Sequence, residues 1–220
     1  MNSTKLNISP DGLKTRQELV TDAIRLAILT GRFRPGDKLD QTELADELHV
    51  SRSPVREALR TLAAEELITH TPHRGAVVTE RSLDELKELL FIRSLLEGAA
   101  AKRAAGHMDE PRLNRLEQIV NEADESNDVE HVLALNNQFH TTIYQAVEQP
   151  MIIDLIQSMR NKVAPYNRIF LDMEGTKDAA WLAHRRILAA CRDRDGDRAE
   201  QETRRHLAEV FDSIVTGLGM

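Results

Sequence analysis

The stretch that most constrains the fold covers residues 42–62, TELADELHVSRSPVREALRTL. Its apolar residues recur at helical spacing, pause at His49 and Val50, and then resume at intervals of three and four residues. This pattern predicts two short helices joined by a tight turn, which is a helix-turn-helix. Ser53 is expected to cap the second helix, with Pro54 at the first helical position, where a missing N–H costs nothing.

The second of these helices is expected to carry an unusually basic polar face. Arg52, Ser53, Arg56 and Arg60 fall on its outward side, and residues 51–60 hold three Arg against one Glu. In a helix-turn-helix, the N-terminal end of the second helix meets base edges and phosphates in the major groove of DNA. The segment therefore predicts DNA binding through hydroxyl and guanidinium groups.

The net charge of the whole chain, −7, would argue against DNA binding if it were spread evenly. Residues 1–80 carry 11 Lys and Arg against 12 Asp and Glu, whereas residues 81–220 carry 18 against 24. The acidity therefore belongs to the second part of the chain. The local surplus of positive charge in residues 51–60 remains compatible with a DNA-reading helix.

Two short β-prone runs follow within residues 66–79, on either side of a turn that contains Pro72, His73, Arg74 and Gly75. They predict a β-hairpin wing, in which Gly75 allows a tight turn and a close approach to a partner. Residues 13–80 are therefore expected to form a winged helix-turn-helix domain. The polar residues 1–12 are expected to be a mobile arm.

The remainder, residues 82–217, predicts an all-α antiparallel bundle of about six helices joined by short loops. Aromatic residues make up 4% of the chain and charged residues 30%, which favours packed amphipathic helices over a sheet sandwich. Ser82 and Glu85 have the spacing of a capping box, so we expect the domain boundary there. Gly106 is expected just past the end of one helix, Pro165 is expected to bend another, and residues 193–197 are expected to form a turn.

The chain shows features of a cytoplasmic protein without membrane association. Its single cysteine, Cys191, cannot form an intramolecular disulfide, which fits a reducing compartment. No apolar run approaches the ~18 residues of a membrane span, and the first residues lack the pattern of a signal peptide.

Four residues of the helical region could converge on a divalent metal. Asn136 and His140 are four residues apart and share one helix face, while His184 and His206 belong to two later helices. Taken singly, each histidine is more often an ordinary, partly buried side chain. Spacing alone does not select His184 and His206 from the eight histidines of the chain.

Several separated motifs agree in order and spacing with a known family: residues 28–39, 43–45, 50–59 and 73–75. They resemble the N-terminal domain of the GntR family of bacterial transcription regulators. The resemblance implies that Arg52 and Arg56 contact an operator, and that the wing approaches the minor groove or the backbone. The full set of expected DNA-binding residues is Thr42, Ser51, Arg52, Ser53, Arg56, Arg74 and Gly75.

A second resemblance covers about residues 82–215. The segments 93–97, 136–140, 183–188 and 205–207 are similar to the signature positions of the FCD ligand-binding domain of the FadR subfamily. The resemblance implies that Asn136, His140, His184 and His206 bind a metal, and three imidazoles favour zinc or nickel. Many members have Asp where this chain has Asn136, and the neutral amide is the weaker donor.

FCD domains commonly sense small carboxylic acids, which an open metal position and an Arg can hold together. Arg93 is the first candidate for that Arg, although an ion pair with Glu97 explains it equally well. Asn137 and Arg168 are further candidates for contacts to a small carboxylate or sugar acid.

The expected function is that of a homodimeric regulator, not an enzyme, which represses from a pseudo-palindromic operator until its effector binds. Two alternatives remain open, a metal-sensing regulator and a metal-dependent hydrolase fused to a DNA-binding head.

Overall fold

A computed structural model describes residues 14–173 and 175–219, so the arm expected at residues 1–12 lies outside the described part. Backbone contacts divide the chain into two compact units, with the division between Arg81 and Ser82. Among the described residues, no helix combines the length and the apolar composition that a membrane crossing requires.

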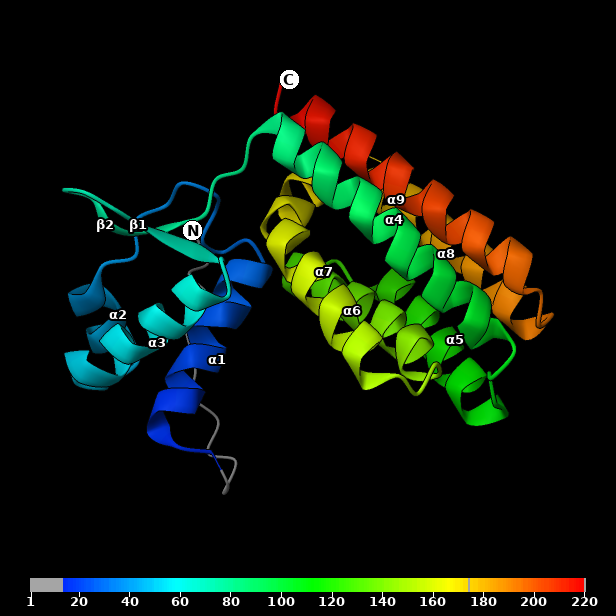
Figure 1. Ribbon diagram of the computed structural model, residues 1–220, viewed down its shortest axis with the longest axis horizontal. Helices are drawn as coiled ribbons and strands as arrows, with labels where there is room; N and C mark the ends of the chain where they lie inside the picture. The colour runs from blue at the N-terminus through cyan, green and yellow to red at the C-terminus, as the bar shows by residue number, and fades with distance from the viewer. Residues whose placement is uncertain (1–13, 174, 220) are drawn as a thin grey trace. The chain divides into compact units, whose positions relative to one another are not determined.

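The described part of the first unit, residues 14–81, contains three helices and a hairpin (Figure 1). Its elements are α1 (Arg16–Leu29), α2 (Gln41–Glu47), α3 (Arg52–Ala64), β1 (Ile68–Thr71) and β2 (Gly75–Val78). The strands pair antiparallel, with Ile68 opposite Val78. Helix α1 packs against α3, and the apolar residues of the predicted helix-turn-helix lie in the core of this unit. The expected winged helix-turn-helix is confirmed.

The start of α3 differs from the prediction. The helix begins at Arg52, with Ser51 as its N-cap residue, so the assignment of the cap to Ser53 was wrong. The first four amides of a helix have no partner within it, so a proline is tolerated beyond the first position. Pro54 therefore did not fix the start of the helix, and Ser51, in extended backbone with ψ 163, is where the chain enters the helix.

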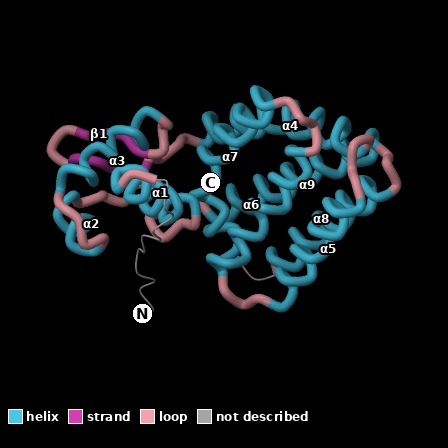
Figure 2. The backbone as a smooth tube through the Cα atoms, turned by 90° about the horizontal axis from the view of Figure 1, so that it is seen from below, coloured by secondary structure: helices cyan, strands magenta, loops and turns pink. Residues whose placement is uncertain are grey.

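The second unit is the expected all-α bundle (Figures 1 and 2). Its elements are α4 (Leu83–Ala105), α5 (Glu110–Glu125), α6 (Val129–Gln145), α7 (Pro150–Leu171), α8 (Thr176–Arg192) and α9 (Gly196–Gly217). The capping box of Ser82 and Glu85 is present at the start of α4. Pro165 lies inside α7 as expected, and the helix continues through it.

Helices α4 and α9 lie side by side along much of their length, as Figure 1 shows. The alanines near the end of α4 are buried, and small side chains allow such close packing. Two details of the prediction were wrong here. Gly106, expected one position beyond the C-cap, is the C-cap residue of α4 itself, with φ −71. Gly196 and Asp197 belong to α9, because Asp195 caps that helix from one residue before.

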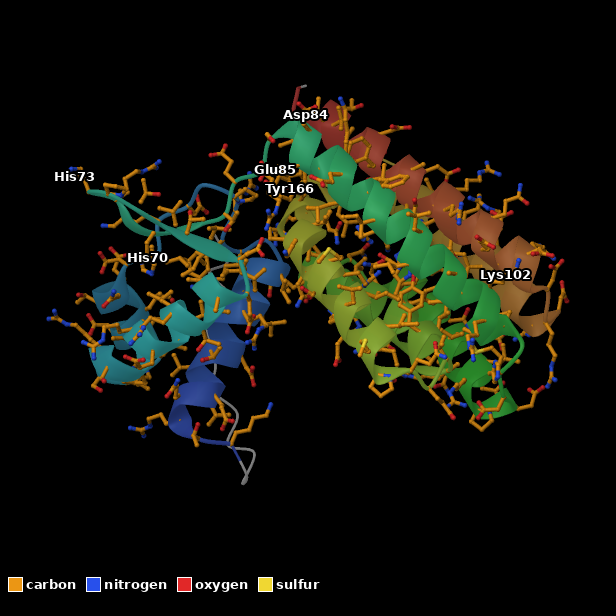
Figure 3. All side chains as sticks on the ribbon, in the orientation of Figure 1. His70, His73, Asp84, Glu85, Lys102 and Tyr166 are labelled. Atoms are coloured by element: carbon orange, nitrogen blue, oxygen red, sulfur yellow. The ribbon has the colours of Figure 1, made fainter. Side chains whose placement is uncertain are left out.

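The close packing gives Gly196 a steric role. A Cβ added at Gly196 would lie 2.7 Å from the carbonyl oxygen of Lys102, the residue labelled near the end of α4 in Figure 3. We expect Gly196→Ala to lower the free energy of unfolding by about 1–3 kcal/mol, although alanine is the better helix former. Urea unfolding followed by circular dichroism measures this.

Gly106→Ala is the matched control for that substitution. Its added Cβ would meet no atom closer than the carbonyl oxygen of Arg103, at 3.7 Å, and its φ is one that alanine adopts. This variant should be as stable as the parent or more stable by up to about 1 kcal/mol. Equal stability of the two variants would contradict the steric role of Gly196.

Candidate metal centre and DNA-binding surface

Three histidines from three helices meet inside the bundle. His140 lies on α6, His184 on α8 and His206 on α9, and all three are buried. One ring nitrogen of each lies within 4.8 Å of the others. The Nε2 atoms of His140 and His184 are 3.2 Å apart. Two nitrogens bound tetrahedrally to zinc at ~2.0–2.1 Å are about 3.3–3.4 Å apart, so this pair is close to coordinating distance.

Aromatic side chains pack against the cluster. The ring centroids of Phe139 and Trp181 each lie 4.5 Å from that of His184. Burial, followed by the charge of Arg160, lowers the pKa of His140 well below its ordinary value. Burial likewise lowers the pKa of His184 well below its ordinary value and that of His206 to about 4. The imidazoles are therefore neutral at neutral pH, which is the form that binds metals.

Two ring nitrogens of the cluster have no hydrogen-bond partner in the described structure. The Nδ1 atoms of His184 and His206 are buried without a hydrogen-bond partner among the described residues. Buried polar atoms normally have a partner, and a missing one often marks an absent ion or water. Three neutral imidazoles whose ring nitrogens lie within 4.8 Å of one another fit a zinc or nickel ion.

The two asparagines of the prediction are placed differently. Asn136 is half-buried one helical turn before His140, on the same face of α6. Asn137 is exposed. The structure thus brings the three histidines together, with Asn136 on the same face of α6 as His140, whereas Asn137 is exposed.

A buried network of charges lies on the neighbouring helices. Glu97 of α4 is fully buried and accepts a hydrogen bond from Arg93 Nε at 2.6 Å and one from Arg160 Nη1 of α7 at 3.1 Å. Burial alone raises the pKa of Glu97, but the charges of Arg93 and Arg160 outweigh it, so the pKa is lowered. The ion pair considered for Arg93 therefore exists.

The network has one positive charge more than it has negative charges, because two guanidinium groups face one carboxylate. The charge of Arg160 contributes to lowering the pKa of all three histidines of the cluster, so the two groups of residues are electrostatically in reach of each other. Arg160 Nε is buried without a hydrogen-bond partner among the described residues. Such an arrangement can bind an anion.

Sequence reasoning missed Arg160. Its spacing could have indicated burial, because Arg160 lies four residues after Ile156 and three before Val163. All three residues are on the buried face of α7. Arg168, which was expected instead, lies 4.0 Å from Glu130.

Arg93 also lies on the wall of an otherwise apolar pocket between α4, α7 and α9. The residues lining it are Leu86, Leu90, Arg93, Val163, Leu207, Val210, Phe211 and Ile214. Leu207 adjoins His206 in α9, so the pocket and the histidine cluster share that segment of helix.

The seven residues expected to bind DNA are all exposed, and they belong to the first unit. Arg52 and Arg56 lie in the first turns of α3, and the only ion pair that the structure describes for Arg56 is a long one, 3.5 Å to Glu57. Arg74 lies in the hairpin turn next to His73, which Figure 3 labels at the tip of the wing. The wing turns tightly there, with φ +79 at Gly75.

Comparisons with known proteins agree with this architecture. Residues 16–78 match the family described as bacterial regulatory proteins, gntR family, and residues 88–209 match the FCD domain. The chain is 31% identical over 194 residues to the HTH-type transcriptional repressor RspR of Escherichia coli K12, covering 87% of this chain and 85% of that protein. It is 26% identical over 185 residues to the Nta operon transcriptional regulator of Aminobacter aminovorans, covering 83% and 87%.

Two solved structures share the fold over nearly their whole length. E. coli McbR/YncC superposes with a TM-score of 0.78 at 23% identity, covering 93% of this chain and 97% of that one. A putative GntR regulator from Rhodococcus sp. RHA1 superposes with a TM-score of 0.74 at 25% identity, covering 94% and 99%. The fold and its surfaces define a winged helix-turn-helix transcriptional regulator with a helical second domain. The chain belongs to the GntR family, and its second domain is an FCD domain.

Proposed function

We propose that the protein is a homodimeric repressor that binds a pseudo-palindromic operator and leaves it when a small carboxylic acid binds beside a metal in the FCD domain. The observation that carries this proposal is the buried site. Three histidines with nitrogens within 4.8 Å of one another lie in electrostatic reach of two arginines that share a single carboxylate.

The charge of this site favours an anionic effector. Arg93 and Arg160 carry two positive charges against the one negative charge of Glu97, and the histidines are neutral. His140, His184 and His206, together with Asn136, would hold a divalent metal, which would supply two more positive charges and a Lewis acid for a carboxylate oxygen. The surplus is deeply buried, where an unbalanced charge is costly, so a carboxylate is stabilised there.

The position of Arg93 supports a direct role for it. Its Nε donates to Glu97 and its side chain borders the apolar pocket, which supports our assignment of its outer amino groups to a carboxylate. We assign Arg160 to effector binding together with Arg93, in place of the earlier candidates Asn137 and Arg168. Asn137 is exposed, and Arg168 lies near Glu130.

We assign operator binding to the first unit. One helix-turn-helix reads only a short half-site, so two copies related by a two-fold axis are the usual way to reach useful specificity. Arg52 and Arg56 read the major groove in this proposal, together with the hydroxyls of Thr42, Ser51 and Ser53, and Arg74 and Gly75 approach the backbone or minor groove.

Thermal melting of metal-free and metal-loaded protein against a panel of carboxylic, hydroxy and sugar acids tests the proposal. An acid at one hundred times its dissociation constant stabilises the folded state by about 2.7 kcal/mol. We expect stabilisation by one class of acid in the zinc- or nickel-loaded protein. The same acid should release the protein from DNA that it selects out of a random pool. Absence of any stabilising acid contradicts the effector assignment.

The same experiment separates the two alternatives. A metal sensor would bind or leave its DNA as the metal concentration changes, with no acid present. A metal-dependent hydrolase would consume an acid or ester of the panel, which chromatography of the mixture detects. The named relatives are transcription regulators, which favours the repressor over the hydrolase.

A further inference from the structure

Tyr144 connects the charge network to the histidine cluster. Its hydroxyl lies 2.7 Å from Oε2 of Glu97 and 3.3 Å from Nδ1 of His140. Glu97 comes from α4 and the other two residues from α6, and all three are buried. Because these three side chains are buried, we assign the protons of their contacts within the group.

Counting protons fixes the direction of each hydrogen bond. Glu97 lies between two guanidinium groups and is an ionised carboxylate, which can only accept. The single hydroxyl proton of Tyr144 therefore goes to Glu97, and the oxygen of Tyr144 can only accept from His140. Nδ1 of His140 must then be the donor.

The proton on Nδ1 of His140 also determines the state of its Nε2 atom. A neutral imidazole carries one N–H, so His140 with a proton on Nδ1 has a bare lone pair on Nε2. That Nε2 atom lies 3.2 Å from Nε2 of His184, so in the metal-free protein His184 must donate through Nε2. Nδ1 of His184 then carries no proton.

We propose that Tyr144, held by Glu97, is a positioning residue that fixes His140 as the Nδ1–H tautomer and presents its bare Nε2 atom to the histidine cluster. Metal-binding histidines are commonly held in this way by a carboxylate or carbonyl group, and here a tyrosine hydroxyl stands between the imidazole and the carboxylate. The Nδ1–H tautomer of His140 is inferred from hydrogen bonding alone. Its consequence for metal affinity rests on the proposed function.

Nitrogen NMR of metal-free protein labelled with ¹⁵N-histidine tests the tautomer directly. Long-range proton–nitrogen correlations distinguish an N–H ring nitrogen from a bare one, and a His140→Asn variant identifies the signals of His140. We expect His140 to carry its proton on Nδ1 and His184 to carry its proton on Nε2. A proton on Nε2 of His140 in the parent protein overturns the proposal, and this result requires no variant and no metal.

Tyr144→Phe tests the role of the hydroxyl, with Tyr166→Phe as the matched control. These are the two tyrosines of the chain, both are buried, and Tyr166 lies in a separate apolar cluster of the bundle. We expect the Nδ1–H tautomer of His140 to lose its dominance in Tyr144→Phe and to persist in Tyr166→Phe. An unchanged tautomer in Tyr144→Phe, with native circular dichroism, overturns the proposal.

Zinc affinity, measured by competition with a chromophoric chelator, gives the second readout. Loss of such an outer partner typically weakens metal binding by roughly 10- to 100-fold, which we expect for Tyr144→Phe and not for Tyr166→Phe. Equal zinc affinity of Tyr144→Phe and the parent overturns the positioning role. If the parent binds no zinc or nickel at all, the metal assignment fails, while the tautomer result still decides how Tyr144 and His140 are bonded.

Discussion

His184→Ala is expected to weaken zinc or nickel binding by roughly 100- to 1000-fold, because it removes one of three imidazoles. Structural zinc sites are worth about 10–16 kcal/mol over four ligands, so one ligand accounts for about a quarter of this free energy. Isothermal titration of the metal-stripped protein measures the loss. His184 is the most informative choice because its ring contacts both other histidines of the cluster.

His131→Ala is the control for that substitution. His131 is on the same helix as His140 but is partly exposed, at 42% of its side chain, and faces Glu122 at 3.2 Å. Its removal should leave metal affinity within about threefold of the parent, since it is no part of the cluster. If the two variants bind metal equally well, the histidine cluster is not the metal site. Because His184 packs against Phe139 and Trp181, the melting of both variants should be recorded without metal.

The helices and the wing could be predicted because their signals are local. The capping box of Ser82 and Glu85 and the apolar spacing of residues 55–62 each depend on neighbours within one or two turns. The prediction of the first residue of α3 was wrong because local signals were ambiguous there. Serine is a favoured N-cap residue, and nothing in the neighbouring sequence distinguishes Ser51 from Ser53.

The buried site could be predicted only in part. Asn136 and His140 share a face of α6 by their spacing, but His184 and His206 were selected by resemblance to a family and not by any local rule. The hydrogen-bond network of Glu97 could not be predicted from the sequence, because its partners Tyr144 and Arg160 lie 47 and 63 residues away along the chain. Only the packing of α4 against α6 and α7 brings them together.

Arg56→Ala should abolish retention of operator DNA at physiological salt while leaving the helix content unchanged. Each well-placed arginine contact to a base is worth ~1–3 kcal/mol, and a homodimer loses two of them, so we expect affinity to fall roughly 30- to 20,000-fold. Arg56 is exposed and makes only a long contact to Glu57, so the folded state should lose no more than about 0.5 kcal/mol. Gel retardation with DNA selected from a random pool measures the affinity.

Arg60→Ala is the matched control, and the two variants together decide what Arg56 does. Arg60 lies one turn further along α3, is also exposed, and makes a similarly long contact of 3.4 Å to Glu57. It is expected to face solvent, so its loss should change affinity by less than about threefold. If Arg56 contacts a base, Arg56→Ala also relaxes the preference for one base pair. If it contacts only phosphate, binding weakens on all sequences and the salt dependence falls by about one ion per half-site. Equal retention of DNA by the parent and Arg56→Ala would contradict the assignment of α3 to the major groove.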